Sequence, residues 1–388
     1  MPVLWRSEAC DQKPDPQTGV FSVRLTQAAQ HSVNVYCEQP YTSPDGRRIA
    51  IMRSSEPDPR LPPFELLVAD VQTLRSTSVE KGAISILVGT AAWSGWIYYV
   101  SADRELMRVN LSTLEKEVVW TRWPFPPEFV LDSVSADLRY LVGAQFRADF
   151  MTELVRVDLA ERTWKMIYEA KECLGHVQFN PVPAAGDDLL VQLNRRQSYN
   201  HMWEPRAVEN PLGGATHFII DSDGGNVRPL AIGEPHTISS AGHSAWMADS
   251  GRIAVATHWD FATWQLDSRW PQGNLFTVAP GDAKPTVIEA PGHRFNHVGV
   301  SRCGRYFVCD SYPERLPAPI AIVVGSLQTG RWRVLLHNCG ASGGGPACSH
   351  PHAYFTADSK NVIYNADPYW IGQVFAARVP GGFLESLS

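Results

Sequence analysis

The chain has 388 residues, 44% of them hydrophobic, and a formal net charge of -6. Because basic residues do not cluster, nothing in the sequence is suited to neutralising phosphates, and we expect no nucleic-acid partner. No run of 18 apolar residues and no apolar signal core is present, so we expect neither membrane association nor export. The seven cysteines form no CxxC pair, and buried free thiols in a reducing cytoplasm are therefore expected.

Short segments rich in β-branched and aromatic residues dominate the chain, and few segments have the period of a long helix. They are bounded by Gly, Pro, Asp and Ser, and hairpin turns recur between them. Successive turns are about 40 to 60 residues apart, which is the length of a four-stranded propeller blade. The turns lie at the SPDGRR run that starts at Ser43 and near Gly95, Asp137, Gly186, Asp249, Cys303 and Asp358.

Each hairpin is followed by a further pair of strands, as in residues 105–120 and 153–168, where two strands flank a polar turn. Seven such units close radially and leave only short, protected edges. Residues 20–26 precede the first complete unit and are predicted to pair with the last blade. We therefore predict an all-β fold, a single seven-bladed β-propeller domain over residues 1–388 that is closed by an N-terminal strand. A pair of β-sandwiches is the alternative, but it does not explain the shared turn position.

Four of the hairpins carry a histidine at an equivalent position. His243, His297 and His352 each lie six residues before the turn residue, and His176 aligns with them when its longer turn is allowed for. The innermost strand of each blade lies beside the central channel, so equivalent side chains from neighbouring blades converge near one rim. A single histidine on an inner strand is usually a hydrogen-bonded core residue, but four in one register indicate a site.

The sequence His350-Pro351-His352 places two imidazoles on the same face of one strand, a spacing suited to chelating one ion. His297 from the adjacent blade would supply a third nitrogen and leave positions open for water or substrate. The sequence thus predicts a metal site. Imidazole ligands suit zinc, iron, copper or nickel, whereas manganese usually takes oxygen ligands as well.

Taken in order along the chain, these motifs resemble those of the oligogalacturonate lyases. The resemblance rests on HVQFNP at His176, GHSAWMADSGRIAV at Gly242, NHVGVSRCGRYFVCD at Asn296 and HPHAYFTADSKNVIYNAD at His350. The N-terminal DPQTGVFSVRLT, the following His31 and the SPDGRRIAI run also look like the opening of that family. The resemblance covers nearly the whole chain as an ordered series of blade motifs.

This resemblance implies a seven-bladed propeller that cleaves short pectic oligouronides by β-elimination with a bound divalent cation, typically Mn²⁺. Carried over by motif position, His297, His350 and His352 are the metal ligands and His243 is the base. The glutamine ligand of the family falls at Ala347 in this sequence. This departure leaves three alternatives, a site with three protein ligands, a site with another oxygen ligand, or weak metal binding, and it also leaves a divergent substrate open.

The reaction also follows from the chemistry of the residues. A uronate carries an acidic proton on C5, next to its carboxylate, and a sugar leaving group on C4. A cation on the carboxylate stabilises the enolate-like intermediate, and a histidine is suited to take the proton at neutral pH. We therefore expect a carbon–oxygen lyase that acts on acidic oligosaccharides and uses His243 as its base.

A long insertion at residues 194–218 is rich in Asn, Arg, His and Trp, and long loops in compact domains tend to be functional. Arg206 and His201 are candidates for holding the carboxylates of neighbouring sugars. Tyr199 is a second candidate for the base or the acid. Candidates for stacking on or contacting the sugars are Trp203, Trp246, His31 and His176.

Two other functions stay open at this point. One is a lyase acting on glucuronate- or iduronate-containing oligomers, and the other is a non-catalytic propeller that mediates interactions. The second predicts no bound metal and no effect of substitutions at the histidines. The sequence does not determine the oligomeric state.

Overall fold

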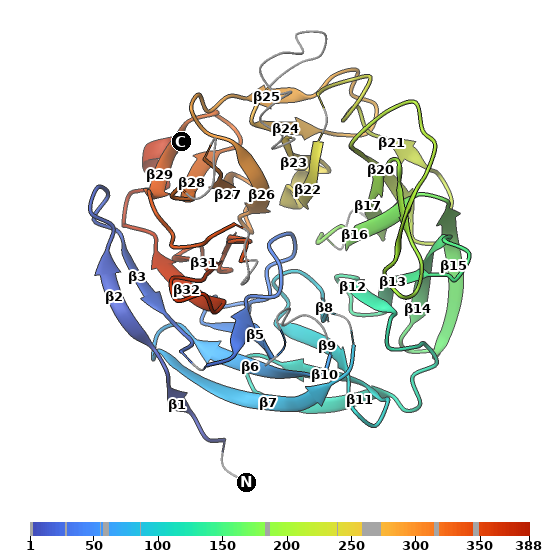
Figure 1. The fold of residues 1–388 in the computed structure, drawn as a ribbon, viewed down its shortest axis with the longest axis horizontal. Coiled ribbons are helices and arrows are strands. Elements are labelled where there is room, and N and C mark those ends of the chain that lie inside the picture. Colours follow the sequence, from blue (N-terminus) through green and yellow to red (C-terminus); the bar gives the residue numbers. More distant parts are fainter. Residues whose placement is uncertain are drawn as a thin grey trace.

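The structure is a computed structural model that describes residues 3–27, 29–54, 56, 62–85, 87–182, 187–238, 240–257, 273–313, 318–343 and 349–388. Its sheets stand around a common axis, and the chain runs once around the ring (Figure 1). Besides strands and loops, the described residues contain two short 3-10 helices, η2 (Ala248–Ser250) and η3 (Glu385–Leu387). The predicted all-β propeller is confirmed. No helix in these ranges is long and apolar enough to cross a membrane.

The N-terminal half of the ring is built from two sheets. The first has the strand order β1-β7-β6-β5-β4, and the second joins β11-β10-β9-β8 to β12-β13-β14-β15 through one parallel pair, Thr90 with Ser133. The strands are β1 (Arg6–Ser7), β4 (His31–Val33), β5 (Arg48–Ser54), β6 (Phe64–Asp70), β7 (Arg75–Ala83), β8 (Gly89–Thr90), β9 (Trp96–Val100), β10 (Leu106–Asn110), β11 (Lys116–Trp120), β12 (Val130–Val134), β13 (Tyr140–Phe146), β14 (Thr152–Asp158) and β15 (Thr163–Ala170).

The C-terminal half follows the same meander. One sheet has the order β16-β17-β20-β22-β23-β24-β25 with β21 beside β20, another runs β26-β27-β28-β29, and the hairpin β18-β19 stands apart. The strands are β16 (Cys173–Phe179), β17 (Asp188–Asn194), β18 (Gln197–Tyr199), β19 (Pro205–Ala207), β20 (Ala215–Asp221), β21 (Arg228–Pro229), β22 (Ser240–Trp246), β23 (Ile253–Thr257), β24 (Leu275–Val278), β25 (Thr286–Ile288), β26 (Phe295–Val300), β27 (Tyr306–Ser311), β28 (Ala321–Ser326) and β29 (Trp332–Leu336).

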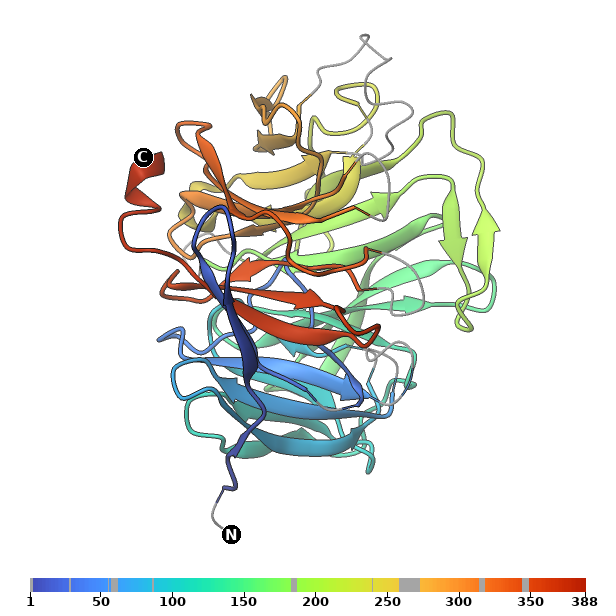
Figure 2. The same cartoon turned by 60° about the vertical axis from the view of Figure 1, so that its left-hand side comes forward.

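Both ends of the chain contribute to one further sheet. Its order is β2-β3-β32-β31-β30, formed by β2 (Cys10–Pro14), β3 (Phe21–Arg24), β30 (Tyr354–Phe355), β31 (Asn361–Ala366) and β32 (Gln373–Arg378). Strand β3 pairs antiparallel with β32, opposing Ser22 to Ala377 and Arg24 to Phe375. In Figure 2 the dark-blue N-terminal hairpin crosses the molecule beside the red C-terminal strands.

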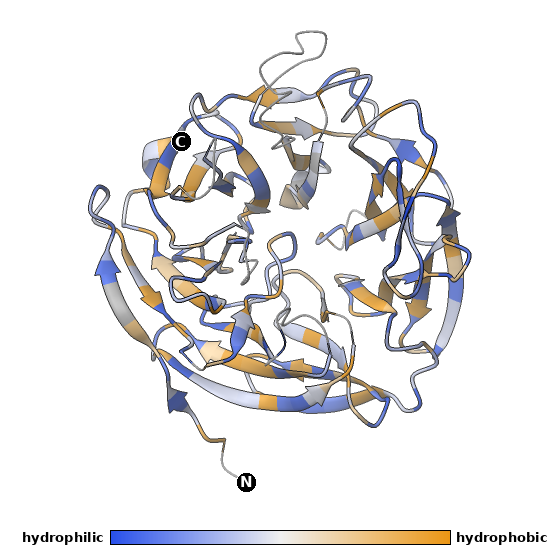
Figure 3. Ribbon diagram, in the orientation of Figure 1, coloured by the Kyte–Doolittle hydropathy of each residue, from blue (hydrophilic) through white to orange (hydrophobic). Residues whose placement is uncertain are grey.

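The core consists of apolar clusters between neighbouring sheets. Strand β27 is buried along its whole length, whereas most residues of the outer strand β15 are exposed. Inner strands are covered on both faces by adjacent blades, so they contain continuous apolar runs. On the outer strand β7, hydrophilic and hydrophobic residues follow one another in short stretches (Figure 3). The removal of apolar surface from water between the blades therefore holds the ring together.

The innermost strand of four blades carries a β-bulge ahead of its hairpin turn. The bulges lie between Leu131 and Ser133 in β12, Gly175 and Gln178 in β16, Ser240 and Ser244 in β22, and Phe295 and Val298 in β26. A bulge leaves its extra residue outside the ladder and re-aims that side chain. The residues that these bulges release from pairing include Asp132, His176, His243 and His297.

Candidate active site

Five histidine rings lie together where the inner strands of different blades approach one another. The ring centroid of His243 lies 5.7 Å from that of His176 and 4.0 Å from that of His297. The His297 ring in turn lies 4.3 Å from His352 and 5.5 Å from His350. The rings come from β16, β22, β26 and the segment just before β30. Residues separated by up to 176 positions in the chain, from His176 to His352, thus share one cluster.

The backbone at two of these histidines is held in an uncommon conformation. His176 has φ of 51° and His352 has φ of 45°, both in the left-handed region that disfavours side chains with a Cβ. Near His352 an asparagine network fixes the chain: the Asn34 amide donates to the His352 carbonyl at 2.8 Å, and the Asn34 backbone N–H donates to the Asn365 side chain at 2.8 Å. Such conformations persist when the surroundings over-determine them, and they cluster at functional sites.

A tyrosine that the sequence motifs did not indicate stands among the imidazoles. The Tyr36 ring centroid lies 4.4 Å from that of His352, 5.4 Å from His176, 6.2 Å from His297 and 6.3 Å from His243. Tyr36 belongs to the connection between β4 and β5, residues 34–47, which is far longer than a hairpin requires. In Figure 1 a blue loop from this region reaches toward the middle of the ring. The length of this connection is a sequence signal that could have indicated Tyr36.

His297 is paired with a fully buried carboxylate. The Nδ1 atom of His297 lies 2.7 Å from Asp310 Oδ2, and the His297 backbone N–H donates to Asp310 Oδ1 at 2.8 Å. Burial raises the pKa of Asp310 to about 6, although the hydrogen bond from the His297 backbone lowers it in part. Asp310 lies on β27 opposite the β26 bulge, and nothing in the sequence motifs singled it out.

His243 is held by a backbone carbonyl. Its Nδ1 lies 2.9 Å from the Asn296 carbonyl oxygen, which only accepts hydrogen bonds. The neutral ring therefore carries its proton on Nδ1 and a lone pair on Nε2. Burial lowers the pKa of His243 well below its ordinary value, and the neighbouring His297 and His176 add to the effect. The arrangement keeps one imidazole of the cluster unprotonated at neutral pH, with its Nε2 lone pair able to accept a proton.

His176, at the other edge of the cluster, is paired with a second buried carboxylate. Glu38 Oε2 lies 2.9 Å from His176 Nδ1, and Glu38 Oε1 accepts the Ser244 backbone N–H at 3.2 Å. The Glu38 side chain is only 4% exposed, and it reaches the cluster from the same loop as Tyr36. Like Tyr36 and Asp310, Glu38 was not predicted from the sequence.

The donor chemistry of two of these rings suits a metal ion. Nδ1 of His297 is engaged by Asp310, and Nδ1 of His350 lies 2.6 Å from the Tyr312 hydroxyl. Metal-ligating histidines typically hold an oxygen partner at the second ring nitrogen, which would make Nε2 the ligand atom here. Within the described ranges, however, no group of three or more His, Cys, Asp or Glu side chains is already arranged to hold a metal ion. Ala347, at the position of the family's glutamine, lies outside the described residues.

The insertion residues lie on a neighbouring blade. Strands β18 and β19 form a hairpin that stands out from the ring (Figure 2). Trp203 packs against Phe146 with ring centroids 4.7 Å apart, and the Arg206 guanidinium lies 4.4 Å from the Phe150 ring centroid. The contacts of the hairpin are thus with the end of β13 and the β13–β14 connection. The remaining candidates of this segment are the partly buried Tyr199, 6.1 Å from Trp203 by ring centroid, and the exposed His201.

This hairpin nevertheless leaves the sheet on the histidine side. Asn194, the last residue of β17, pairs with Cys173, the first residue of β16. The insertion therefore starts at the end of the blade where β16 begins, three residues before His176. The insertion thus leaves its blade at the histidine end and packs outward over the preceding blade.

Trp246 and His31, two further candidates for substrate contacts, make structural contacts with other parts of the protein. Trp246, expected beside the site as a sugar platform, is 4% exposed, and its indole N–H donates to the Gln178 carbonyl at 3.1 Å. Strand alternation turns this side chain into the core between blades, so it presents no free face. His31 lies on β4, and its Nδ1 accepts the Gly372 backbone N–H at 3.0 Å. His31 therefore links the first and last sheets.

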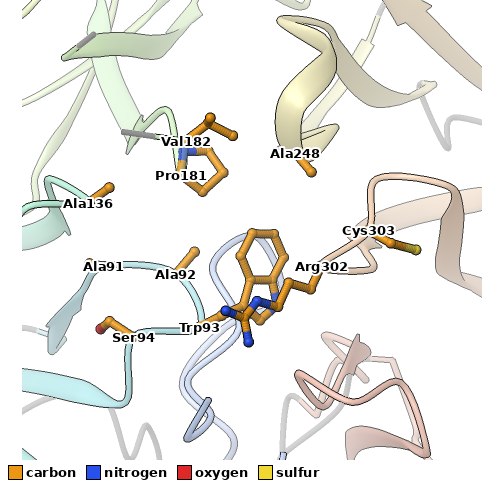
Figure 4. A pocket seen from close by; sticks show the side chains of 10 residues that line it. All are labelled: Ala91, Ala92, Trp93, Ser94, Ala136, Pro181, Val182, Ala248, Arg302 and Cys303. Carbon is orange, nitrogen blue, oxygen red and sulfur yellow. The ribbon is translucent and has the colours of Figure 1, made fainter. Parts of the chain in front are cut away.

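A hollow of about 390 Å³ lies at the opposite ends of the inner strands. It is lined by residues of five hairpin turns, among them Trp93, Pro181, Arg302 and Cys303 (Figure 4). Cys303 is exposed, unlike the buried thiols expected from the sequence, while the other described cysteines are at least partly buried. Arg302 donates to the Pro44 carbonyl at 3.0 Å. The lining contains neither imidazole nor carboxylate, so the acid–base chemistry of the described residues lies at the histidine end.

The fold and the cluster together define an all-β propeller with an imidazole-rich site inside its ring. No protein-family model matches the chain. It is 24% identical to an oligogalacturonide lyase of Pectobacterium atrosepticum and 22% identical to an oligogalacturonate lyase of Dickeya dadantii, in each case over 94% of this chain and 95% of the relative.

Two solved structures have the same fold. An oligogalacturonate lyase in complex with manganese superposes with a TM-score of 0.70 at 19% identity, covering 99% of this chain and 98% of the other. An oligogalacturonate lyase from Vibrio parahaemolyticus gives 0.71 at 16% identity, covering 99% and 100%. These likenesses support the oligogalacturonate lyase family for this chain, as the sequence motifs predicted.

Proposed function

We propose that the protein cleaves short, uronate-containing pectic oligosaccharides by β-elimination and releases a 4,5-unsaturated uronide. The observation that carries the proposal is the contact between His243 and His297, whose ring centroids lie 4.0 Å apart. One of the two is an imidazole kept neutral by burial, and the other belongs to a trio suited to a cation. The two relatives also support the proposal, since they are named as oligogalacturonide and oligogalacturonate lyases.

In the proposed reaction His243 removes the C5 proton of the uronate. Its Nδ1 proton is fixed on the Asn296 carbonyl, so Nε2 is the basic atom. A lowered pKa keeps this atom unprotonated at neutral pH, and general bases of this type contribute about 10²- to 10⁴-fold to rate. The electron pair of the C5–H bond becomes the C4–C5 double bond, and the C4–O bond breaks.

His297, His350 and His352 would hold a divalent cation. Mn²⁺ is the proposed ion, because the related lyase structure is a manganese complex. A cation there would neutralise the substrate carboxylate and stabilise the charge that forms beside it. Asp310 and Tyr312 support the proposal by fixing two of the imidazoles through Nδ1. With alanine at position 347, water or substrate oxygens would complete the oxygen ligation that manganese favours.

The remaining candidates are assigned to substrate binding at the rim. Arg206 and His201 on the insertion would hold carboxylates of sugars beyond the cleaved bond, Trp203 would stack on a ring, and Tyr199 would assist. Their support is the position of the insertion at the end of the blade where β16 begins. His31 would contact the substrate from the β4 side.

We also propose that the ring has seven blades and that β3 closes it. Support comes from the antiparallel meanders that begin at β4, β8, β12, β16, β22, β26 and β30. The pairing of β3 with β32 supports the closure, because it joins the two ends of the chain in one sheet. A single domain of this kind explains why histidines distant in sequence share one site.

The test is a panel of galacturonate, glucuronate and iduronate oligomers incubated with the protein and Mn²⁺, with and without chelator. Ultraviolet absorbance of a 4,5-unsaturated uronide and product mass spectrometry report the reaction. We expect absorbance with galacturonate oligomers and its loss with chelator. Absence of the unsaturated product on every uronide would remove the lyase assignment.

A further inference from the structure

Besides a base, the proposed elimination requires a group that protonates the leaving sugar oxygen. When the C4–O bond breaks, its electron pair stays on the departing sugar oxygen, which must receive a proton to leave as a hydroxyl. In a galacturonate the C5 hydrogen and the C4 oxygen lie on opposite faces of the sugar ring, so the base that has taken the C5 proton does not face the departing oxygen. An acid is therefore needed on another side of the reacting sugar, within reach of the base.

We propose that His176, charged and oriented by Glu38, is the acid that protonates the leaving oxygen. This inference rests on the proposed lyase function and adds a catalytic residue to it. His176 and His297 are both neighbours of His243, at 5.7 Å and 4.0 Å between ring centroids. The base is thus flanked by the ring assigned to the cation and by a ring that is outside the proposed ligand trio.

The Glu38 contact supplies the charge. A buried carboxylate 2.9 Å from Nδ1 favours the imidazolium form of His176, since an adjacent opposite charge stabilises the protonated ring. Glu38 itself is not the acid: one oxygen faces His176 and the other accepts the Ser244 N–H, so both are occupied as acceptors. The proton that can be given to substrate then lies on Nε2 of His176, because Nδ1–H points to Glu38.

The backbone conformation at His176 directs its side chain away from the pairing of β16. His176 lies in the β16 bulge with φ of 51°, so its side chain leaves the alternation of the strand. Such a strained position in a strand is tolerated when other contacts hold it. The His176 side chain is 29% exposed, in contrast to Glu38 behind it. A partly open ring backed by a buried carboxylate is an arrangement in which Nδ1 is fixed and the outer nitrogen can meet a ligand.

The other titratable groups near His176 do not replace Glu38. Among the described residues these groups include Asp132 on β12, His217 on β20, His243 on β22 and Tyr36 in the same loop as Glu38. Burial raises the pKa of Asp132 to about 8, and burial lowers that of His217 to about 3, so both are neutral at pH 7. Glu38 Oε2, 2.9 Å from Nδ1, is therefore the carboxylate oxygen paired with His176.

The step balances without a further reactant. His243 takes the C5 proton, the C5–H electron pair forms the C4–C5 double bond, the C4–O bond breaks, and the leaving oxygen takes the Nε2 proton of His176. The products are the unsaturated uronide and a shortened oligosaccharide with a free hydroxyl. Proton exchange with solvent then returns His243 to the neutral form and His176 to the charged form.

The experiment compares wild type with His176→Gln on two substrates in the presence of Mn²⁺. One is a galacturonate trisaccharide, and the other is a galacturonide with a 4-nitrophenyl ether on C4, whose phenolate leaves without a proton. We expect cleavage of the trisaccharide to fall about 100-fold and release of nitrophenolate to fall less than about 5-fold. Equal losses on both substrates, or no loss on either, would overturn the proposal.

Solvent exchange gives a readout that a structural role would not produce. In D₂O the His176→Gln variant retains its base, so we expect uncleaved trisaccharide to gain deuterium at C5 faster, relative to cleavage, than with wild type. A variant that loses exchange and cleavage together has lost the site as a whole, which contradicts an acid role. His236→Gln, a substitution at an exposed turn residue, is the matched control and should behave as wild type in both assays.

Substitution Glu38→Gln tests the His176–Glu38 pair by changing the carboxylate instead of the histidine. It also provides a test if the His176→Gln variant does not fold. It keeps a hydrogen-bonding side chain but removes the charge, so the alkaline limb of the kcat/KM profile should move to lower pH. An unmoved limb in a folded variant contradicts the assignment. Wild-type protein that cleaves no uronide overturns the lyase function, whereas an active wild type with an equally active His176→Gln variant overturns only the acid.

Discussion

The imidazole rings of His243 and His297 lie 4.0 Å apart by centroid, although β22 and β26 belong to different blades. Each ring is fixed through Nδ1, one by a carbonyl and the other by a buried carboxylate. The acceptor is uncharged for His243 and a carboxyl group for His297, and this difference gives the two rings different chemical roles. A carbonyl partner holds a neutral ring, while a carboxylate partner makes the ring a stronger donor to a cation.

Substitution His243→Gln should lower turnover of galacturonate oligomers by about 10²- to 10⁴-fold, because it removes the general base. Metal content should stay at the wild-type level, since the proposed ligands are other residues. Initial rates from the absorbance of the unsaturated product, together with elemental analysis, check both parts. Near-normal turnover would exclude His243 as the base.

Substitution His352→Gln should lower the bound Mn²⁺ per chain, and prolonged dialysis against chelator should remove both metal and activity. The physical reason is the loss of one of the three imidazole donors proposed to hold the cation. Elemental analysis and isothermal titration with Mn²⁺ measure the effect, with His236→Gln as the control. Unchanged metal binding in the His352 variant would place the cation elsewhere.

Substitution Arg206→Ala should raise KM for longer oligomers by about 10-fold and leave that for the shortest substrate unchanged, since one charge-assisted hydrogen bond contributes about 1.5–3 kcal/mol. The insertion leaves the blade at the histidine rim but packs over Phe150, so a contact is expected only with distal sugars. Steady-state kinetics on an oligomer series provide the measurement. A fall in kcat on every length would instead place Arg206 at the reacting bond.

Substitution Asp132→Asn should stabilise the protein at neutral and alkaline pH. Burial raises the pKa of Asp132 to about 8, and its Oδ2 has no hydrogen-bond partner. Below about pH 4 the Asp132 carboxyl is protonated in both the folded and the unfolded state, so its ionisation does not lower the free energy of unfolding of the wild type. As pH rises toward 8 the unfolded state ionises first, so wild-type stability falls by up to about 1.4 kcal/mol per pH unit. Urea unfolding at pH 4, 6 and 8 should show a growing advantage of the variant; a constant difference would contradict this account.

Substitution Asp15→Ala should destabilise the attachment of the N-terminal segment by about 2 kcal/mol at pH 7. Burial raises the pKa of Asp15, but hydrogen bonds from the Thr18, His337 and Gln17 backbone N–H groups outweigh it and lower the pKa to about 2. The stabilisation is complete above about pH 4 and is lost as pH falls through 2. Unfolding of wild type and variant at pH 7, 4 and 2 should therefore converge at the acid end. A difference that persists at pH 2 would indicate a contribution from packing instead.

The sequence by itself determined the all-β propeller and the positions of the histidines, because both are local properties. Alternating polarity, turn residues and the six-residue distance from histidine to turn are set within one hairpin, and each blade repeats them. The likeness to the oligogalacturonate lyases rests on the same repeated motifs.

The tertiary structure alone decided which groups meet the imidazoles. Tyr36 and Glu38 reach them from a loop between β4 and β5, Asp310 lies opposite a bulge, and Tyr312 approaches His350 from the next blade. It also turned Trp246 into the core. These contacts join residues far apart in the chain, and they depend on bulge direction and on the way the ring brings the blades together. No local pattern carries that information, since strand alternation specifies a face but not the partner across it.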